Sequence, residues 1–175
     1  PHGNRLALTL SHGVHPDTHK REPATHNTTL ISKSFSIRSE ATWMSYAQSL
    51  IFTSDRSGKP QIYQASAGGG GATRITFQGE YNSNASVSYD GKRIAMVQGS
   101  GNVYRIAVLD RTTGESKAIS PGNLDEHPSF APNGSMILYA ATEGTRGVLY
   151  AVSADGRVRQ RQGLADVAVR AAAWS

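Results

Sequence analysis

Short runs in which apolar and polar residues alternate extend along most of the chain, and turns rich in glycine separate them. Such alternation is typical of β-strands whose two faces have different surroundings. The runs are built from Val, Ile, Leu and Tyr and are too short for long helices. The pattern therefore favours a protein of strands and turns.

Three of these runs share one pattern. A small residue is followed by Ser, Thr or Val, then by an apolar residue, a turn and an alternating strand. They are ATWMSYAQSLIF (41–52), ASVSYDGKRIAM (85–96) and PSFAPNGSMILY (128–139). The apolar marker positions are Trp43, Val87, Phe130 and Trp174, spaced 44, 43 and 44 residues apart. A period of this length indicates a repeat architecture.

Other apolar positions keep the same step, which makes chance an unsatisfactory explanation. They are Ile31, Ile75 and Ile119; Leu6, Leu50 and Ile94; and Ile62, Ile106 and Leu149.

Each repeat is predicted to contain four strands. The first ends at the marker residue, and a turn such as Asp90-Gly91 or Asn133-Gly134 leads to the second. The predicted second strands are 93–97 and 136–140, the third strands 61–65 and 148–152, and the fourth strands 73–76 and 117–120.

Four antiparallel strands in about 44 residues form one blade of a β-propeller, so we predict an all-β fold. An open β-sandwich with incidental similarity is the alternative. The expected organisation is one propeller domain or fragment over 1–175. Its repeats are approximately 1–38 (without a first strand), 39–82, 83–125 and 126–169, with 170–175 as a further first strand.

The two ends of the chain complement each other. Joined, Trp174-Ser175 and Pro1-His2-Gly3 match the motif at 130–134, so the chain holds four repeats' worth of sequence. Propellers have about four to eight blades. A small closed ring and a piece of a larger propeller both stay open.

The composition limits the classes of partner. The 175 residues carry a formal net charge of +5, but the basic residues are scattered, with no run longer than Lys20-Arg21. We therefore do not expect nucleic-acid binding. No apolar run approaches a membrane span, so we expect no direct membrane insertion. The absence of cysteine excludes disulfides and thiolate zinc sites.

Three segments closely resemble the C-terminal propeller of the TolB family, the periplasmic component of the Tol-Pal system. They are LIFTSDRSGKPQIY (50–63), LDEHPSFAPNGSMILYA (124–140) and VSADGR (152–157). The resemblance implies a periplasmic location and a six-bladed propeller. One mouth of that propeller would bind the peptidoglycan-associated lipoprotein Pal and colicin translocation segments, supporting outer-membrane integrity. An N-terminal α/β domain, through which the family contacts TolA, has no counterpart here, so no TolA contact is expected.

The first repeats depart from the family pattern. The expected Pro-Asp-Gly turn reads Pro1-His2-Gly3 in the first repeat and Ser45-Tyr46-Ala47 in the second. The third strand of the first repeat reads THKREP (18–23). A proline and three charges weaken a half-buried strand, so we expect this strand to be poorly ordered or to pair irregularly.

The resemblance also implies which residues line the mouth. These are the residues just before the first strand of each blade, where the strands are expected to begin near Ala41, Ser86 and Pro128. The candidate partner-binding residues are Ser39, Glu40, Asn82, Asn84, Ala85, Asp125, Glu126, His127 and Arg170. Loops on a rigid scaffold commonly carry binding residues. Alternatively, Asp125 and Glu126 serve only their own loop, since Asp side chains often bond to the turn backbone.

No enzyme is predicted. Glu40, Asp125 and Glu126 could act as paired carboxylates only in a pocket that separates their pKa values. A related propeller precedes the catalytic domain of prolyl oligopeptidase-like serine peptidases, so a gating propeller is the alternative function. No G-x-S-x-G nucleophile motif is present. The glycines at 68–71 and 99–101 lack the Gly-Lys-Ser/Thr of a phosphate loop and are predicted hairpin turns.

Four of the six histidines lie in SHGVHPDTHKREPATH (11–26), which has the appearance of a metal-binding loop. When the sequence is shifted by the repeat length of 44 residues, however, residues 8–19 align with residues 52–63 without a gap. His12 and His15 then fall in the exposed hairpin of a blade, and His19 falls in its third strand. A closed zinc site needs four convergent ligands. We expect neither a metal site here nor a cofactor, although a ring of carboxylates in the channel could hold Ca²⁺.

Overall fold

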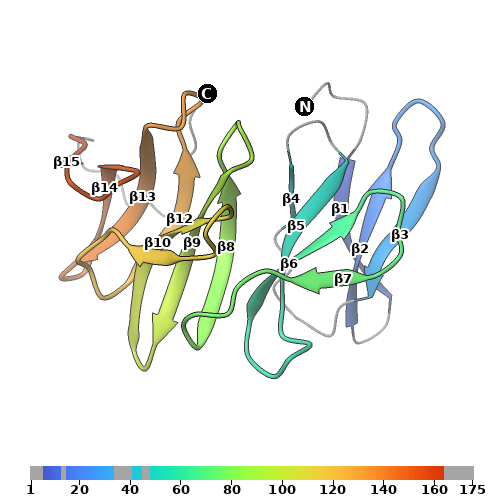
Figure 1. The fold of residues 1–175 in the computed structure, drawn as a ribbon, viewed down its shortest axis with the longest axis horizontal. Coiled ribbons are helices and arrows are strands. Elements are labelled where there is room, and N and C mark those ends of the chain that lie inside the picture. The colour runs from blue at the N-terminus through green and yellow to red at the C-terminus, as the bar shows by residue number, and fades with distance from the viewer. Residues whose placement is uncertain (1–5, 13–14, 34–40, 45–47, 164–175) are drawn as a thin grey trace. The chain divides into compact units, whose positions relative to one another are not determined.

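Strands make up every regular element in the described part of the chain (Figure 1). The computed structural model describes residues 6–12, 15–33, 41–44 and 48–163. No helix among them is long and apolar enough to span a membrane. The strands form four antiparallel sheets, and the chain divides into two compact units, Pro1–Phe77 and Gln78–Ser175. The predicted all-β architecture of successive antiparallel blades is confirmed.

The first unit contains two sheets. The first sheet has the order β1 (Leu6–His12), β2 (His15–Arg21) and β3 (Thr28–Lys33). The second has the order β4 (Ala41–Trp43), β5 (Ser49–Ser54), β6 (Gln61–Ser66) and β7 (Ala72–Arg74). A core cluster of Leu50, Phe52, Tyr63 and Ala65 covers one face of the second sheet, and Ala7 and Trp43 pack against it.

The third strand of the first repeat pairs regularly with one neighbour and, as expected, irregularly with the other. β2 pairs with β1 without interruption, from Leu6 opposite Arg21 to His12 opposite His15. Against β3 its register shifts once, between Thr18 and His19. The strand ends at Arg21, so Pro23 lies beyond it and removes no donor from the ladder.

The histidine-rich segment is therefore largely strand. In the second blade the corresponding strands stop at Ser54 and Gln61, and a longer turn joins them. In the first blade the strands continue to His12 and His15. The predicted place of these two histidines in the hairpin of the blade is confirmed, and the pairing there extends two residues further on each strand than in the second blade.

The second unit also contains two sheets. One consists of β8 (Tyr81–Val87), β9 (Arg93–Ser100), β10 (Val103–Asp110) and β11 (Ser116–Ala118). The other consists of β12 (Asp125–Phe130), β13 (Met136–Glu143), β14 (Arg146–Ser153) and β15 (Arg159–Arg161). The marker residues Trp43, Val87 and Phe130 each end a first strand, as predicted.

One shared core joins the two sheets of the second unit. Alternate residues of β9 and β10, including Ala95 and Ile106, face alternate residues of β13 and β14, including Ile137 and Tyr139. Phe130 at the end of β12 is buried in the same cluster. A single sheet has two faces to cover, and stacking one sheet on the next buries an apolar face of each.

The pairing register of the central hairpin is the same in all four sheets. The equivalent cross-strand pairs are Leu8 with His19, Phe52 with Tyr63, Met96 with Ala107 and Tyr139 with Tyr150. These pairs follow one another at the sequence period of 44, 44 and 43 residues. The connection from Thr76 to Asn82 is one residue longer than the equivalent connection from Ser120 to Asp125. The change in period is thus taken up between blades.

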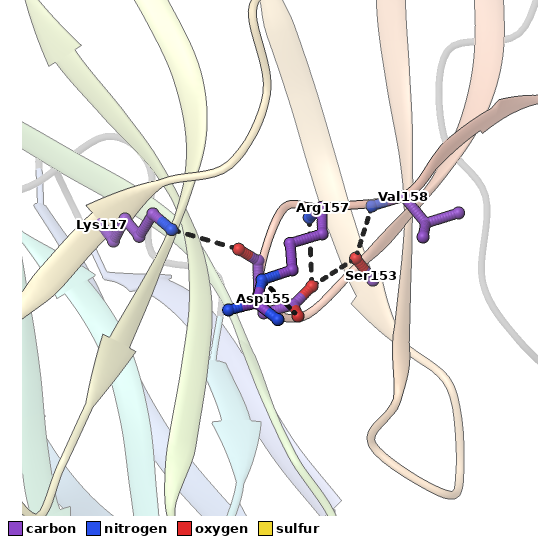
Figure 2. Close-up of polar contacts among 5 residues, drawn as sticks. All are labelled: Lys117, Ser153, Asp155, Arg157 and Val158. Atoms are coloured by element: carbon purple, nitrogen blue, oxygen red, sulfur yellow. Dashed lines mark hydrogen bonds and ion pairs between the residues drawn. The ribbon is translucent and has the colours of Figure 1, made fainter.

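One Ser-x-Asp-Gly turn is used at two different places in the blades, after β8 and after β14. In residues 153–158 the Gly156 amide donates to Ser153 O. The Ser153 hydroxyl and the Arg157 amide both donate to Asp155 Oδ1, at 2.6 and 3.0 Å (Figure 2). The Val158 amide donates to Ser153 Oγ at 2.9 Å. The turn needs a positive φ at Gly156, which is 78°.

The copy at residues 88–93 has the same bonds. The Ser88 hydroxyl and the Lys92 amide donate to Asp90 Oδ1 at 2.6 and 3.0 Å, and the Arg93 amide donates to Ser88 Oγ at 3.0 Å. The bond from Ser88, followed by that from the Lys92 amide, lowers the pKa of Asp90 below its usual value. The predicted turn at Asp90-Gly91 is confirmed.

Basic side chains of one sheet reach backbone carbonyls of the next in the second unit. Lys117 Nζ on β11 donates to Asp155 O at 3.2 Å (Figure 2). Arg93 Nη2 donates to Gly134 O at 2.9 Å, and its guanidinium lies 5.7 Å from the ring centroid of Phe130. These contacts hold neighbouring turns together and supplement the apolar core.

Candidate functional site

The first strand of the third blade carries a β-bulge. Along β8 the register against β9 shifts between Ser83 and Ser86, so two residues lie opposite one on β9. Asn84 in this bulge has a φ of 53°. Asn is one of the few residues other than glycine that adopt this left-handed conformation readily.

The first strand of the fourth blade repeats the bulge at the equivalent place. Along β12 the register against β13 shifts between Glu126 and Ser129, and His127 has a φ of 52°. His127 follows Asn84 by 43 residues, which is the repeat step between Val87 and Phe130. Backbone outliers of this kind cluster at functional sites, so their recurrence marks this position as a candidate site.

The two bulges contact each other. Asn84 Nδ2 lies 3.3 Å from His127 Nδ1, and both side chains are half-buried. Close by, the Phe130 amide donates to Ser86 Oγ at 3.1 Å. The first strands of two neighbouring blades are thus joined by polar contacts where their ladders are interrupted.

The structure corrects the position predicted for these residues. Asn82, Asn84 and Ala85 were expected ahead of their strand, as was the segment Asp125 to His127, but they lie inside β8 and β12. The bulges are the physical reason, because an extra residue breaks the alternation by which a strand is recognised in sequence. Pro128 lies in the second bulge, where a missing amide donor is tolerated.

Asp125 begins β12 and is 1% exposed. Its Oδ2 accepts a hydrogen bond of 2.5 Å from Ser120 Oγ, which in turn accepts from the Ile106 amide at 2.8 Å. Asp125 Oδ1 is buried and has no hydrogen-bond partner among the residues that the structure describes, and Gly122 packs so closely against it that no Cβ would fit. Burial raises the pKa of Asp125, and the Ser120 hydrogen bond and the charge of Arg159 partly counter this effect.

Asn82 occupies the equivalent position in β8 and is fully buried. Its Nδ2 donates to Gln78 O at 2.8 Å, and its Oδ1 accepts from Gln98 Nε2 at 3.2 Å. The side chains of Asn82 and Asp125 therefore support the starts of their strands and do not face solvent. For Asp125 this agrees with the alternative in which the residue serves its own loop, because Ser120 lies in the connection that leads to β12.

The remaining candidates differ in accessibility. Glu126 is exposed, and Asn84, Ala85 and His127 are partly exposed. Ser39, Glu40 and Arg170 lie outside the described residues. The structure thus brings Asn84 and His127 together, with Glu126 next to them in the chain.

Sequence reasoning missed Ser86 and Ser120 as part of this site. A signal for Ser86 was present, since Thr42, Ser86 and Ser129 each precede a marker residue. A hydroxyl that recurs at the repeat step can bond to the next blade, as Ser86 does to the Phe130 amide.

The exposed groups suit hydrogen bonding to a partner. A carboxylate, an imidazole and an amide can together accept and donate bonds to peptide groups and charged side chains. Among the described residues, no three His, Cys, Asp or Glu side chains gather as metal ligands would. A calcium ion in the channel stays a prediction.

Comparisons with known proteins agree with the architecture. A family model described as the TolB beta propeller domain matches residues 1–175. The Tol-Pal system protein TolB of Xanthomonas campestris pv. campestris is 66% identical over 113 residues, which cover 63% of this chain and 26% of that protein. The chain thus spans about a quarter of the length of such curated relatives.

Solved structures show the same fold. TolB from Acinetobacter baumannii has a TM-score of 0.83 at 40% identity, covering 90% of this chain and 40% of that chain. A puromycin-hydrolyzing peptidase of Mycobacterium tuberculosis has a TM-score of 0.70 at 17% identity, covering 92% and 27%. The second likeness extends to the fold alone.

Proposed function

Because the chain belongs to the TolB β-propeller family, we propose that it is a non-enzymatic, periplasmic binding module of the Tol-Pal system that binds Pal. The exposed groups around the Asn84–His127 contact are the proposed binding site. Such binding would help to connect the outer membrane to peptidoglycan.

The observation that carries this proposal is the pair of matching bulges. The positive φ of Asn84 and of His127 has a conformational cost. The contact between the two residues, at 3.3 Å, brings polar side chains of two blades together. Glu126 adds a carboxylate that can accept hydrogen bonds from a partner's Lys, Arg or backbone amides. Ser39, Glu40 and Arg170 fall near the same step of other repeats and are proposed as partner-binding residues of their own blades.

Colicin translocation segments are proposed as second users of the same surface, because the resemblance to the TolB family implies them. A gating role beside a peptidase domain is the alternative. The peptidase propellers share the fold at 17% identity or less, and no residue of the site favours this role.

The test is calorimetric titration of the 175-residue chain with the soluble domain of Pal. We expect a 1:1 complex, and His127→Ala should weaken it about tenfold, the loss of more than 1 kcal/mol that marks a contact residue at an interface. His127→Asn keeps a residue that tolerates positive φ, and so separates loss of the imidazole from loss of the bulge. Lys92→Ala, in the turn after β8, is the control and should bind like the wild-type chain. A folded chain that does not bind Pal, or one that His127→Ala leaves unchanged, contradicts the proposal.

A further inference from the structure

In the described part of the second unit, the last strand has an outer edge to which no other described strand is bonded. β15 is the final strand in the order β12-β13-β14-β15, and all three of its residues are exposed (Figure 1). Two backbone hydrogen bonds flank the paired residues of β15 and β14, from the Ser153 amide to Val158 O and from the Gln162 amide to Leu149 O. In an antiparallel ladder alternate residues bond to the neighbouring strand. The backbone groups of Arg159 and Arg161 therefore point away from β14.

The side chain of Arg159 lies over the face of the sheet, against Tyr150 of β14 and Tyr139 of β13. Its guanidinium lies 3.4 Å from the ring centroid of Tyr150, and its Nε donates to Tyr139 Oη at 2.6 Å. None of the described carboxylates forms an ion pair with it. A stacked guanidinium keeps free N–H groups in a fixed fork, which suits a carboxylate.

Two further arginines flank Arg159 in the chain, and nearby acidic groups offset their charges only weakly. Arg161 and Arg157 have side chains that are 63% and 85% exposed, and each lies 3.5 Å from an acidic oxygen, on Glu143 and Asp155 respectively. Both acids already accept other bonds, Glu143 from the Tyr150 hydroxyl and Asp155 from its own turn. Exposed pairs of this kind contribute little, so the edge keeps an excess of positive charge.

From these observations we propose that β15 is a docking edge for an extended acidic segment of a partner protein. The segment would add as a further strand, bonding to the outward backbone groups of Arg159 and Arg161. Its carboxylates, at alternate positions about 7 Å apart, would lie beside these two residues, on the same face of the sheet as their guanidinium groups. The surface is separate from the bulges at Asn84 and His127, so the two proposals fail independently.

Charged side chains on an edge strand have another known use, which is to prevent strands from pairing at all. The two roles differ in their response to an acidic strand. A protective edge rejects every added strand, whereas a docking edge selects one with alternating carboxylates.

The first test measures fluorescence anisotropy of a labelled synthetic peptide in which Glu and Thr alternate, titrated with the 175-residue chain at low ionic strength. We expect binding that weakens as salt is added. A peptide of the same composition with its glutamates contiguous should bind more weakly. Arg159→Gln should weaken binding of the alternating peptide about fivefold, as expected for one exposed charge pair. Lys92→Gln, which removes one charge from the turn after β8, is the matched control and should have a smaller effect.

The second test separates backbone pairing from charge by comparing Arg161→Gln with Arg161→Pro. Both remove the charge, but proline also removes the outward amide while sparing the bonds to β14. We expect Arg161→Pro to bind about fivefold more weakly than Arg161→Gln, the contribution of one hydrogen bond. Circular dichroism checks that both variants are folded.

Several results would overturn the proposal. These are no binding by the wild-type chain, equal binding of the alternating and contiguous peptides, and equal binding by the two Arg161 variants. Any of them would leave the arginines of β15 as a protective edge.

Discussion

Asp125 offers a sharp test of how the second unit is held together. Its carboxylate is almost completely buried, yet among the described residues only its Oδ2 has a hydrogen-bond partner, the Ser120 hydroxyl at 2.5 Å. We predict that Asp125→Asn leaves the stability at neutral pH nearly unchanged, whereas Asp125→Ala lowers it clearly. The difference arises because the amide keeps an acceptor for Ser120 and carries no charge to bury.

The magnitude follows from the groups left behind. In Asp125→Ala the Ser120 hydroxyl still accepts from the Ile106 amide but loses its own acceptor, and a buried donor without a partner costs about 1–3 kcal/mol. We therefore expect the free energy of unfolding to fall by about 2 kcal/mol. Asp125→Asn removes the cost of burying a charge but leaves an amide whose hydrogen bonds are incomplete. The free energy of unfolding should therefore change by no more than about 1 kcal/mol.

The pH dependence has a definite sign. Burial raises the pKa of Asp125 in the folded protein, so the unfolded chain releases this proton at lower pH. The contribution of Asp125 to stability is therefore complete below its unfolded pKa and is lost as the pH rises through the raised value. Relative to Asp125→Asn, the wild-type chain should become less stable as the pH rises from acid toward neutral.

The assay is urea unfolding of the wild-type chain and both variants at a series of pH values, followed by circular dichroism. Hydrogen exchange of the Ile106 amide, which donates to Ser120, reports the same region locally. If Asp125→Asn destabilises as much as Asp125→Ala, or if the wild-type chain gains stability over Asp125→Asn with rising pH, the ionised carboxylate is itself stabilising. The reasoning from burial would then be refuted.

Two further predictions concern turns. Gly156→Ala should destabilise the protein by about 1–2 kcal/mol more than Gly144→Ala. Both glycines have positive φ, but only at Gly156 would the new Cβ meet another residue, Ile119 at 3.2 Å. Thermal unfolding of the two variants measures this difference. The Asp90→Asn variant should lose less stability on acidification than the wild-type chain. The Ser88 hydroxyl lowers the pKa of Asp90 in the folded protein, and the stability that the ionised Asp90 contributes is lost as the pH falls through this lowered pKa. Acid unfolding followed by circular dichroism is the measurement, and equal curves for the two proteins would contradict the prediction.

Much of the fold was predictable because its information is local. The alternation and the marker residues Trp43, Val87 and Phe130 predicted first strands that end where the structure ends them. A step of 44 residues aligned His19 with Tyr63, and both occupy the same cross-strand register. Strand period and turn residues are sufficient for this much.

The site was less predictable because it depends on contacts between blades. Asn84 and His127 were named as candidates, but nothing in the alternation shows that their strands continue through a bulge. The burial of Asp125 and its bond to Ser120 arise only when the end of one blade meets the start of the next. Long-range geometry of this kind has no periodic signature in a single sequence.

The constant register of the hairpins has a consequence for how such a chain can change during evolution. An insertion inside a hairpin would move every following side chain to the opposite face of its sheet. The span from Thr76 to Asn82 and its shorter counterpart from Ser120 to Asp125 show a length difference that disturbs no pairing. Gains and losses of single residues can thus accumulate in the connections between blades, where they alter loop shape while each blade keeps its inherited packing.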